Sequence, residues 1–369
     1  MIISALRLFF LPTMTYPVLR VRLSLVFRSA AALALASLAA CGSTAHGPQA
    51  QSGDAPTTTA TATAPTPTPI KIGIALGGGA TKGFAHIGVI KMLEANGFAP
   101  TLVAGTSAGS VVGAMYASGM TAFELQEKAV ALDESRLRDL QLSSGGLVLG
   151  QKLEDYVNEQ VRNKPLDQLT KPFVALATRL EDGERTVFAR GNTGQTVRAS
   201  SSVPGAFQPV VIGKYHFVDG GIVSPVPVDA VRQLGADVVV AVDISNKARG
   251  KSPSDMLGTL SQSIAIMGQK LGQAELARAD VIIRPKVLDI ASADFSQRTL
   301  AIAEGEKAAL AAMPQIRERV ARVQAERAQA AQQARHAAAQ AQYQACLDNR
   351  SRLQKMAGMA GWGAPCVSP

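Results

Sequence analysis

The sequence predicts an α/β fold, in which a mostly parallel central sheet is covered by helices on both faces in a three-layer α/β/α arrangement. Short apolar segments with the length of buried strands recur from residue 70 onward and alternate with helical patterns. The clearest strand segments are 71–76, 101–104, 173–177, 210–212 and 238–242. We place this domain at residues 70–316, followed by a C-terminal helical extension.

The connections after the first two strands support this assignment. Residues 82–96 repeat apolar side chains at helical spacing, and Gly97 follows them where a helix C-cap residue is expected. A second Gly-rich turn, after 101–104, leads into a helix of small residues that extends to Gly119. Strands that alternate with helices in this way indicate a parallel sheet buried on both faces.

Charge is distributed unevenly along the chain, which argues against a nucleic-acid-binding core. The 369 residues carry a formal net charge of +9. Residues 1–41 contain four Arg and no acid, and residues 315–369 contain eight basic and three acidic residues, whereas the segment between them is neutral. Aromatic residues make up 5% of the chain, too few for the stacking platforms that bind bases. We therefore expect no nucleic-acid partner.

Residues 1–40 are typical of a secretion signal peptide. Three Arg residues precede a small and apolar run, 29–40, that is too short to cross a bilayer as a helix. The run ends in Leu-Ala-Ala-Cys, and this resembles the lipobox of bacterial lipoproteins. In that family the Cys, here Cys41, becomes the first mature residue and carries acyl chains such as palmitate. A buried helix that ends in Cys is the alternative interpretation.

This resemblance implies that Cys41 anchors the protein to a membrane. Several acyl chains give a stable anchor, because each buried CH₂ group contributes about 0.8 kcal/mol. Gly42 stands where lipoproteins retained in the inner membrane commonly have Asp, so we expect a periplasm-facing anchor in the outer membrane. Residues 41–69 are rich in Thr and Pro, a composition that favours an extended tether. Met14 is an alternative start of translation.

The remaining Cys and the His residues bear on disulfides and metals. Cys346 and Cys366 lie close together in sequence and can pair in an oxidising periplasm. The four His residues are scattered, and no Cys/His cluster has the spacing of metal ligands. We therefore expect neither a metal site nor another cofactor.

The last segment, 317–369, is rich in Ala, Gln and Arg and favours a helix. Its apolar stripe fades after Val323. We expect a solvated or loosely docked helix. The alternative is that its positive charge binds a membrane surface or a partner.

A Gly-x-Ser-x-Gly pattern, Gly105-Thr106-Ser107-Ala108-Gly109, stands between a predicted strand and a predicted helix. Small flanking residues allow the tight, strained turn that projects a nucleophilic Ser into a site. The helix that follows directs its positive end toward that site, where it favours a developing anion. The pattern is common by chance, but its strand–turn–helix context predicts that Ser107 is a nucleophile.

A second Gly-rich turn, 77–83, follows the first predicted strand. A phosphate-binding loop is the alternative reading, since such a turn also offers N–H groups at a helix start. A P-loop requires Ser or Thr after Gly-Lys, whereas Lys82 precedes Gly83, and Phe84 follows. A dinucleotide-binding Gly-x-Gly-x-x-Gly pattern that starts at Gly77 places Lys82 at its last position. An oxyanion hole built from backbone N–H groups fits the spacing better.

A third motif, Asp219-Gly220-Gly221, completes a resemblance to the patatin-like phospholipases. That family combines a Gly-rich oxyanion loop carrying Arg or Lys, a Gly-x-Ser-x-Gly turn and an Asp-Gly-Gly or Asp-Gly-Ala turn, in this order. The resemblance extends through residues 199–207, which look like the segment before the family's Asp, and covers most of 70–316. Lys82, where Arg is frequent, and Ser224, where related bacterial sequences often have Asn, are small departures.

The resemblance implies a Ser–Asp dyad that forms an acyl-enzyme, with Asp219 accepting the proton of Ser107. It also implies N–H donors at Gly78, Gly79 and Ala80, with Lys82 supporting the loop. The implied substrates are acyl esters of phospholipids, lysophospholipids or related lipids. Acyl transfer to an acceptor other than water would use the same residues.

Two other interpretations stay open from the sequence. A Ser–His–acid triad needs a His after the nucleophile, and only His216 and His336 meet this condition. A non-catalytic lipoprotein that uses the same fold for lipid binding or envelope assembly is the second interpretation.

Overall fold

The computed structural model describes residues 69–369, except 138, 144–145, 246, 248–253, 292 and 358–364. The predicted signal peptide, Cys41 and residues 42–68 of the predicted tether lie outside the described residues.

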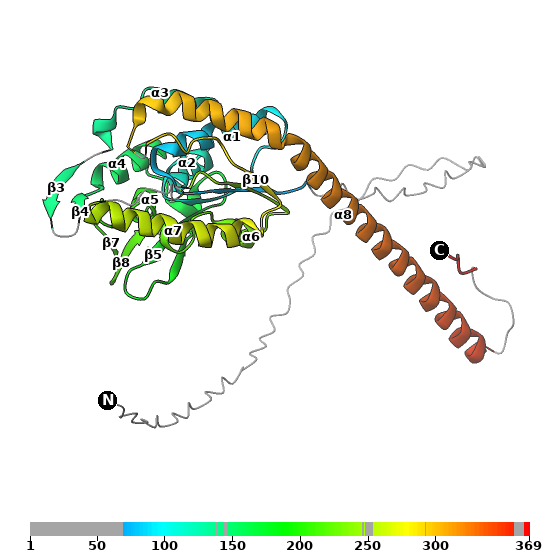
Figure 1. Ribbon diagram of the computed structural model, residues 1–369. Coiled ribbons are helices and arrows are strands. Elements are labelled where there is room, and N and C mark those ends of the chain that lie inside the picture. The colour runs from blue at the N-terminus through cyan, green and yellow to red at the C-terminus, as the bar shows by residue number, and fades with distance from the viewer. Residues whose placement is uncertain are drawn as a thin grey trace, which may run out of the picture. The chain divides into compact units, whose positions relative to one another are not determined.

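An eight-stranded sheet forms the centre of the domain, with strand order β10-β9-β1-β2-β5-β8-β7 and with β6 paired to β5 (Figure 1). Strands β10, β9, β1, β2 and β5 are mutually parallel, whereas β6, β8 and β7 join antiparallel. The bounds are β1 (Ile72–Leu76), β2 (Leu102–Thr106), β5 (Phe173–Arg179), β6 (Arg185–Phe188), β7 (Val210–Ile212), β8 (Tyr215–Asp219), β9 (Val238–Val242) and β10 (Val281–Ile283). A separate hairpin joins β3 (Leu140–Ser143) and β4 (Gly146–Val148).

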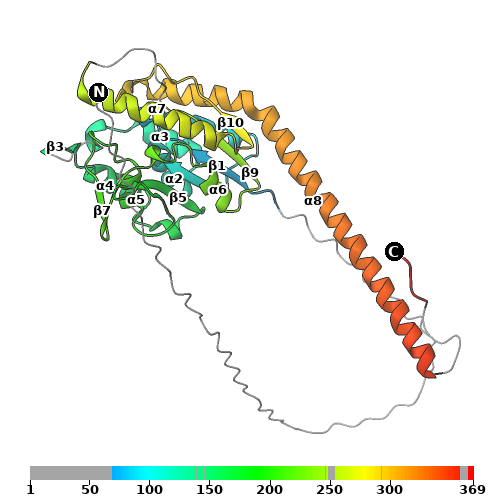
Figure 2. The same cartoon turned by 60° about the horizontal axis from the view of Figure 1, so that its bottom comes forward.

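Eight α-helices lie within the described residues: α1 (Phe84–Ala95), α2 (Ala108–Ala117), α3 (Ala122–Val130), α4 (Gln151–Gln160), α5 (Thr193–Ser200), α6 (Val228–Gln233), α7 (Met256–Leu276) and α8 (Arg298–Ala357). Short 3-10 helices include η1 (Ala80–Gly83), η2 (Glu134–Arg136), η3 (Leu166–Gln168), η4 (Gly220–Ile222) and η5 (Phe295–Gln297). Helices α1, α2, α3, α4 and α8 contribute to the core on one face of the sheet, and α6 and α7 cover the other face (Figures 1 and 2).

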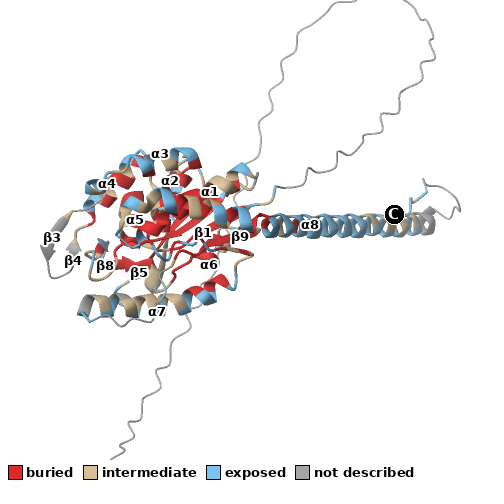
Figure 3. Ribbon diagram, turned by 45° about the horizontal axis from the view of Figure 1, so that its top comes forward, coloured by how far each residue is buried: buried red, intermediate tan, exposed pale blue. Residues whose placement is uncertain are grey.

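Side-chain alternation along the strands explains the two cores. Ile72, Ile74 and Leu76 of β1 join the larger core, whereas Ala75 points to the opposite one. All five residues of β1 are buried, as expected for a parallel strand covered on both faces, and Figure 3 shows the strands as a buried layer. The predicted three-layer α/β/α fold with a mostly parallel sheet is therefore confirmed.

Helix α8 begins inside the domain rather than at the predicted boundary. It starts at Arg298, continues through Pro314, and contains the 316/317 position within its length. Its last buried residue among those described is Val323, and beyond the ion pair of Arg327 with Asp237, residues 328–352 are mostly exposed (Figure 3). No helix among the described residues has the length and hydropathy to cross a bilayer.

A disulfide bond lies near the C-terminus, between the two Cys residues whose spacing in the sequence permits pairing. Cys346, on the exposed part of α8, is bonded to Cys366, with their Cα atoms 5.9 Å apart. The bridge constrains the last residues of the chain, far along the sequence from the sheet.

Two glycines set the contact between α1 and α8. A Cβ atom on Gly305 would lie 2.0 Å from the carbonyl oxygen of Ala85, and one on Gly88 would lie 2.0 Å from that of Ile302. The two helix backbones therefore touch, which is possible only without side chains at these positions.

We expect Gly305→Val to lower the free energy of unfolding by about 1–3 kcal/mol or more, since the added atoms must push α8 away from α1. Ala330→Val, which adds a similar volume to an exposed position of the same helix, is the matched control and should change stability little. Urea denaturation of both variants measures the difference, and equal stabilities would contradict the tight packing.

Candidate active site

Three segments far apart in sequence meet near the carboxyl end of β2. The Gly-rich turn follows β1, Ser107 follows β2, and Asp219 is the last residue of β8. Asp219 pairs with Ala177 on β5, and a Cβ atom on Gly220 would lie 3.2 Å from Thr106 Cγ2, so the Asp turn abuts the Ser turn. The structure thus brings together the predicted site residues of the domain.

Ser107 occupies a strained turn between β2 and α2. Its φ of 53° and ψ of −126° lie where non-Gly residues are rare. The turn is tight because Gly105 and Gly109 have no side chains: a Cβ atom on Gly105 would lie 2.4 Å from Gly109 O, and one on Gly109 would lie 2.1 Å from Leu76 O. These contacts are those expected of a nucleophile elbow.

The backbone of Ser107 is fixed on both sides. Its N–H donates to Ser200 Oγ at 2.9 Å, and its carbonyl accepts from Ser110 Oγ at 2.6 Å and from Ser110 N at 2.7 Å. As the N-cap residue of α2, Ser107 also stands at the positive end of that helix.

Asp219 is buried and has one unsatisfied oxygen. Its Oδ1 accepts the Gly221 N–H at 2.6 Å, whereas Oδ2 is buried without a partner at full hydrogen-bonding geometry. Burial raises the pKa of Asp219 to about 6, although the Ser107 hydroxyl and the Gly221 N–H both favour the charged form. Ser107 is therefore within reach of the carboxyl without a fully formed hydrogen bond, and such pairs often tighten only around a substrate.

The segment before Asp219 links the two residues, a role that the sequence analysis did not assign. Ser200 accepts the Ser107 N–H, and Ser202 O accepts the Asp219 N–H at 2.9 Å. On the other side, Thr178 Oγ1 donates to Asp219 O at 2.8 Å. The Ser-Ser-Ser run at 200–202 was the available signal, because small hydroxyl side chains suit buried hydrogen bonds to backbone.

The Gly-rich turn lies against the nucleophile, but its N–H groups differ in availability. A Cβ atom on Gly78 would lie 3.2 Å from Ser107 Cβ. The Gly78 N–H already donates to Pro225 O at 3.0 Å, so in this structure it is not available to the oxyanion for which Gly78 was predicted as a donor. Within the described part of the chain, the N–H groups of Gly79 and Ala80 have no acceptor, and Ala80 adopts a φ of 53°.

Residues of α1 and η1 form hydrogen bonds that fix the position of this turn. His86 is fully buried, and burial lowers its pKa to about 4, so the ring is neutral and its Nε2–H donates to Gly77 O at 2.8 Å. Lys82 is buried in η1, and its N–H donates to Gly79 O at 3.3 Å. The scattered positions of the four His residues in the sequence gave no signal of this role of His86.

Glu275 of α7 supports the opposite wall. Its carboxylate accepts hydrogen bonds from Ser224 Oγ and, at 2.9 Å, from the Val226 N–H. Ser224 O in turn accepts from Thr106 Oγ1 at 2.8 Å, and Pro225 O accepts the Gly78 N–H. This buried carboxylate, whose pKa burial raises, therefore positions the segment that contacts both the Ser and the Gly turns.

The two His residues after Ser107 in sequence lie elsewhere. His216 is on β8 but its side chain is exposed, and Nδ1 pairs with Glu181 Oε1 at 2.8 Å. His336 is on the exposed part of α8. Neither ring has the buried setting of Ser107 and Asp219.

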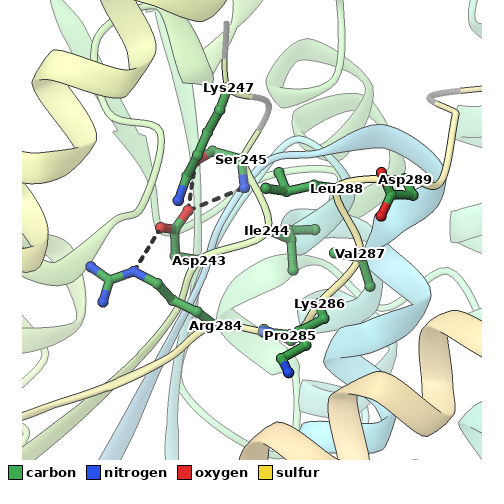
Figure 4. Close-up of a pocket in the computed structure, with 10 residues that line it drawn as sticks. All are labelled: Asp243, Ile244, Ser245, Lys247, Arg284, Pro285, Lys286, Val287, Leu288 and Asp289. Atoms are coloured by element: carbon green, nitrogen blue, oxygen red, sulfur yellow. Dashed lines mark hydrogen bonds and ion pairs between the residues drawn. The ribbon is translucent and has the colours of Figure 1, made fainter. Parts of the chain in front are cut away.

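A pocket of about 360 Å³ (Figure 4) has neither Ser107 nor Asp219 among its lining residues. Its walls come from residues 243–245, 247 and 284–289, at the carboxyl ends of β9 and β10. Ile244 lies between this pocket and the Gly-rich turn, because a Cβ atom on Gly79 would lie 2.7 Å from Ile244 O. Inside it, Asp243 accepts hydrogen bonds from Arg284 and Ser245.

We expect Asp219→Asn to stabilise the protein above pH about 6, since a buried carboxylate with a raised pKa opposes folding once it is ionised. Below pH about 4 the folded and unfolded states both hold the proton, and the charge adds no penalty. Between these values stability falls as pH rises, by about 2–3 kcal/mol in total. Denaturant titrations of wild type and variant across this range measure the effect, and a pH-independent difference would contradict it.

Parts of this domain are similar in sequence to known proteins. Residues 74–232 match the family model for patatin-like phospholipase. An uncharacterised NTE family protein of Mycobacterium tuberculosis is 34% identical over 180 residues, which are 48% of this chain and 50% of that protein. Patatin-like phospholipase domain-containing protein 6 of Homo sapiens is 30% identical over 182 residues, 47% of this chain and 13% of that protein.

Among solved structures, the crystal structure of VipD from Legionella pneumophila aligns with a TM-score of 0.48 and 14% identity, over 67% of each chain. The chain spans about half the length of the mycobacterial relatives that it matches. The family match covers the turns that carry Ser107, Asp219 and the Gly-rich loop. Over residues 74–232, the chain is similar to the patatin-like phospholipase family.

Proposed function

We propose that this protein is a serine esterase that hydrolyses acyl ester bonds of phospholipids, lysophospholipids or related lipids. The observation that carries the proposal is the placement of Ser107, on a strained turn, within reach of the buried Asp219. Similarity to the family and the names of the relatives, patatin-like phospholipases, support a lipid ester as substrate.

The first half of the reaction forms an acyl-enzyme. Ser107 Oγ attacks the ester carbonyl carbon, and the hydroxyl proton passes to Asp219. The tetrahedral intermediate then breaks its bond to the alcohol oxygen, and that oxygen takes the proton from Asp219. Burial makes Asp219 a stronger base than an ordinary carboxylate, yet with a pKa of about 6 it remains ionised at neutral pH.

The negative charge on the carbonyl oxygen needs donors that are not already in use. The N–H groups of Gly79 and Ala80 meet this condition, and the positive end of α2 adds to their effect. Each such donor contributes about 3 kcal/mol to the transition state when it is held in place. The hydrogen bonds of the turn to Val242, Pro225 and His86 hold it there.

Water completes the cycle. It attacks the acyl carbon while Asp219 takes one of its protons, and Ser107 Oγ then leaves with that proton as the acid is released. An alcohol in place of water would give acyl transfer by the same steps.

We expect a fluorophosphonate probe to label Ser107, and hydrolysis of a short-chain ester to fall by about a thousandfold or more in Ser107→Ala and Asp219→Asn. His216→Ala is the matched control, because the exposed His216 pairs with Glu181 and should not affect the rate. Mass spectrometry of the labelled peptide and ester kinetics measure these outcomes. A folded wild type that takes no label would favour a lipid-binding protein without catalysis, and a large loss in His216→Ala would favour a triad.

We also propose that acylated Cys41 anchors the protein in the periplasmic leaflet of the outer membrane. The proposal is supported by the lipobox-like sequence and by the length of the tether, which at about 3.1 Å per residue can extend to roughly 90 Å over residues 42–69. The tether enters at the amino end of β1, whereas Ser107 lies at the carboxyl end of β2, so this reach lets the site face lipid.

We expect wild-type cells grown with an alkyne fatty acid to incorporate the label into this protein, and Cys41→Ser to abolish incorporation. Cys346→Ser, which removes a cysteine that is disulfide-bonded in the structure, is the control and should keep the label. Sequencing of the mature N-terminus provides a second readout. A mature chain that does not begin at Cys41 would rule out the anchor.

A further inference from the structure

Helix α7 carries an apolar stripe that the domain leaves exposed. Leu260, Ile264, Met267 and Leu271 recur at intervals of four, three and four residues, which places them along one side of a helix. Leu260, Met267 and Leu271 are 42%, 51% and 40% exposed, and Ile264 is half-buried. We call these four residues the α7 stripe. Most soluble helices bury such a stripe, whereas none of the side chains described in the first half of α7 is buried (Figure 3).

The neighbouring side of α7 lies against the candidate active site. A Cβ atom on Gly268 would lie 3.6 Å from Gly221 O, and one on Gly272 would lie 3.3 Å from Pro225. At the C-terminal end of α7, the Glu275 carboxylate accepts hydrogen bonds from Ser224 and Val226. Because the Gly221 N–H donates to Asp219, the α7 stripe stands beside the turn that holds the proposed base.

The charges around α7 suit an anionic lipid surface. Residues 245–274 contain four basic residues and one acid in the sequence, and the two basic residues that the structure describes, Lys247 and Lys270, are exposed. That acid, Asp255, is occupied as the N-cap of α7, where its side chain accepts the Gly258 N–H at 3.0 Å. From Met256 to Ala274 the only charged residue is Lys270. An exposed apolar stripe with exposed Lys residues in the same segment of the chain is typical of helices that lie in the interface of anionic membranes.

We propose that the α7 stripe docks on the surface of an anionic bilayer, so that ester substrates reach Ser107 directly from the membrane. This inference deepens the proposed esterase function and rests on it for the identity of the substrate. The stripe inserts among the acyl chains while Gly268, Gly272 and Glu275 keep the helix attached to the domain. Docking by α7 orients the site toward lipid, which a tether at the opposite edge of the sheet does not do.

Insertion of the stripe is tested with an indole reporter in full-length protein bound to vesicles of phosphatidylcholine and phosphatidylglycerol with brominated acyl chains. The sole native Trp is first replaced by Trp362→Phe, and Met267→Trp or Leu310→Trp is then added. Met267 on α7 and Leu310 on α8 are each 51% exposed, so the second variant is a matched control. We expect quenching of the indole at position 267 and not at position 310. Equal quenching, or none at position 267, would overturn the docking.

Catalysis gives an independent readout. In Met267→Asp/Leu271→Asp, we expect the ratio of the rate on vesicle lipid to the rate on a soluble short-chain ester to fall by about tenfold or more. Leu310→Asp should leave both rates unchanged. An unchanged ratio in the α7 variant would contradict the proposal. So would a wild type that dimerises in solution through α7, shown by a halved mass in the variant, since a second copy would then cover the stripe.

The two proposals fail in different ways. If wild type hydrolyses no ester but the indole at position 267 is quenched, the esterase proposal is wrong and α7 docking stands. If both esters are cleaved while quenching and the rate ratio show no role of α7, docking is wrong and the esterase stands.

Discussion

The close approach of three backbone segments around Ser107 is the constraint on which the site depends. Gly105 and Gly109 let the end of β2, the start of α2 and the end of β1 come together at distances that no side chain permits. This packing forces Ser107 into a conformation that an L-residue rarely adopts. The conformational strain of Ser107 is offset by the stability of the parallel sheet, whose neighbouring strands are buried on both faces.

Buried polar groups extend this constraint from the Ser turn to the rest of the site. Ser200 and Ser202 connect Ser107 with Asp219, and Glu275 connects the 224–226 segment with the Gly turn. Such groups are costly to bury unless each has a partner, so the fully paired members hold their neighbours in one arrangement. Oδ2 of Asp219 is one of the few buried polar atoms in the described residues without a partner, and a carboxylate oxygen that is not already in use is available to accept a proton.

The same element that stabilises the site also presents the α7 stripe to solvent. Glu275 and the two glycines fix one side and one end of α7, while its apolar residues extend away from the core. Helix α8 differs from α7. Its first turns pack against α1, and residues 328–352 are mostly exposed without a continuous apolar stripe. One fold thus contains a helix whose apolar residues pack against the core and a helix whose apolar stripe stays exposed.

The sequence by itself determined the α/β class, the mostly parallel sheet and the Ser107 turn, because each depends on residue patterns within a few positions. Strand runs such as 238–242 and the Gly-x-Ser-x-Gly turn encode their own geometry locally. The sequence pattern left α3, α4, α7 and the β3–β4 hairpin unassigned, and it placed the domain boundary inside α8. Only the tertiary structure decided that the Gly78 N–H is taken by Pro225, that His86 holds Gly77, and that Ser200 reaches Ser107. The partners of Gly78 and Ser107 lie far away along the chain, where no periodic pattern links a donor to its acceptor, and His86 differs from any other buried helix residue only through the fold that surrounds it.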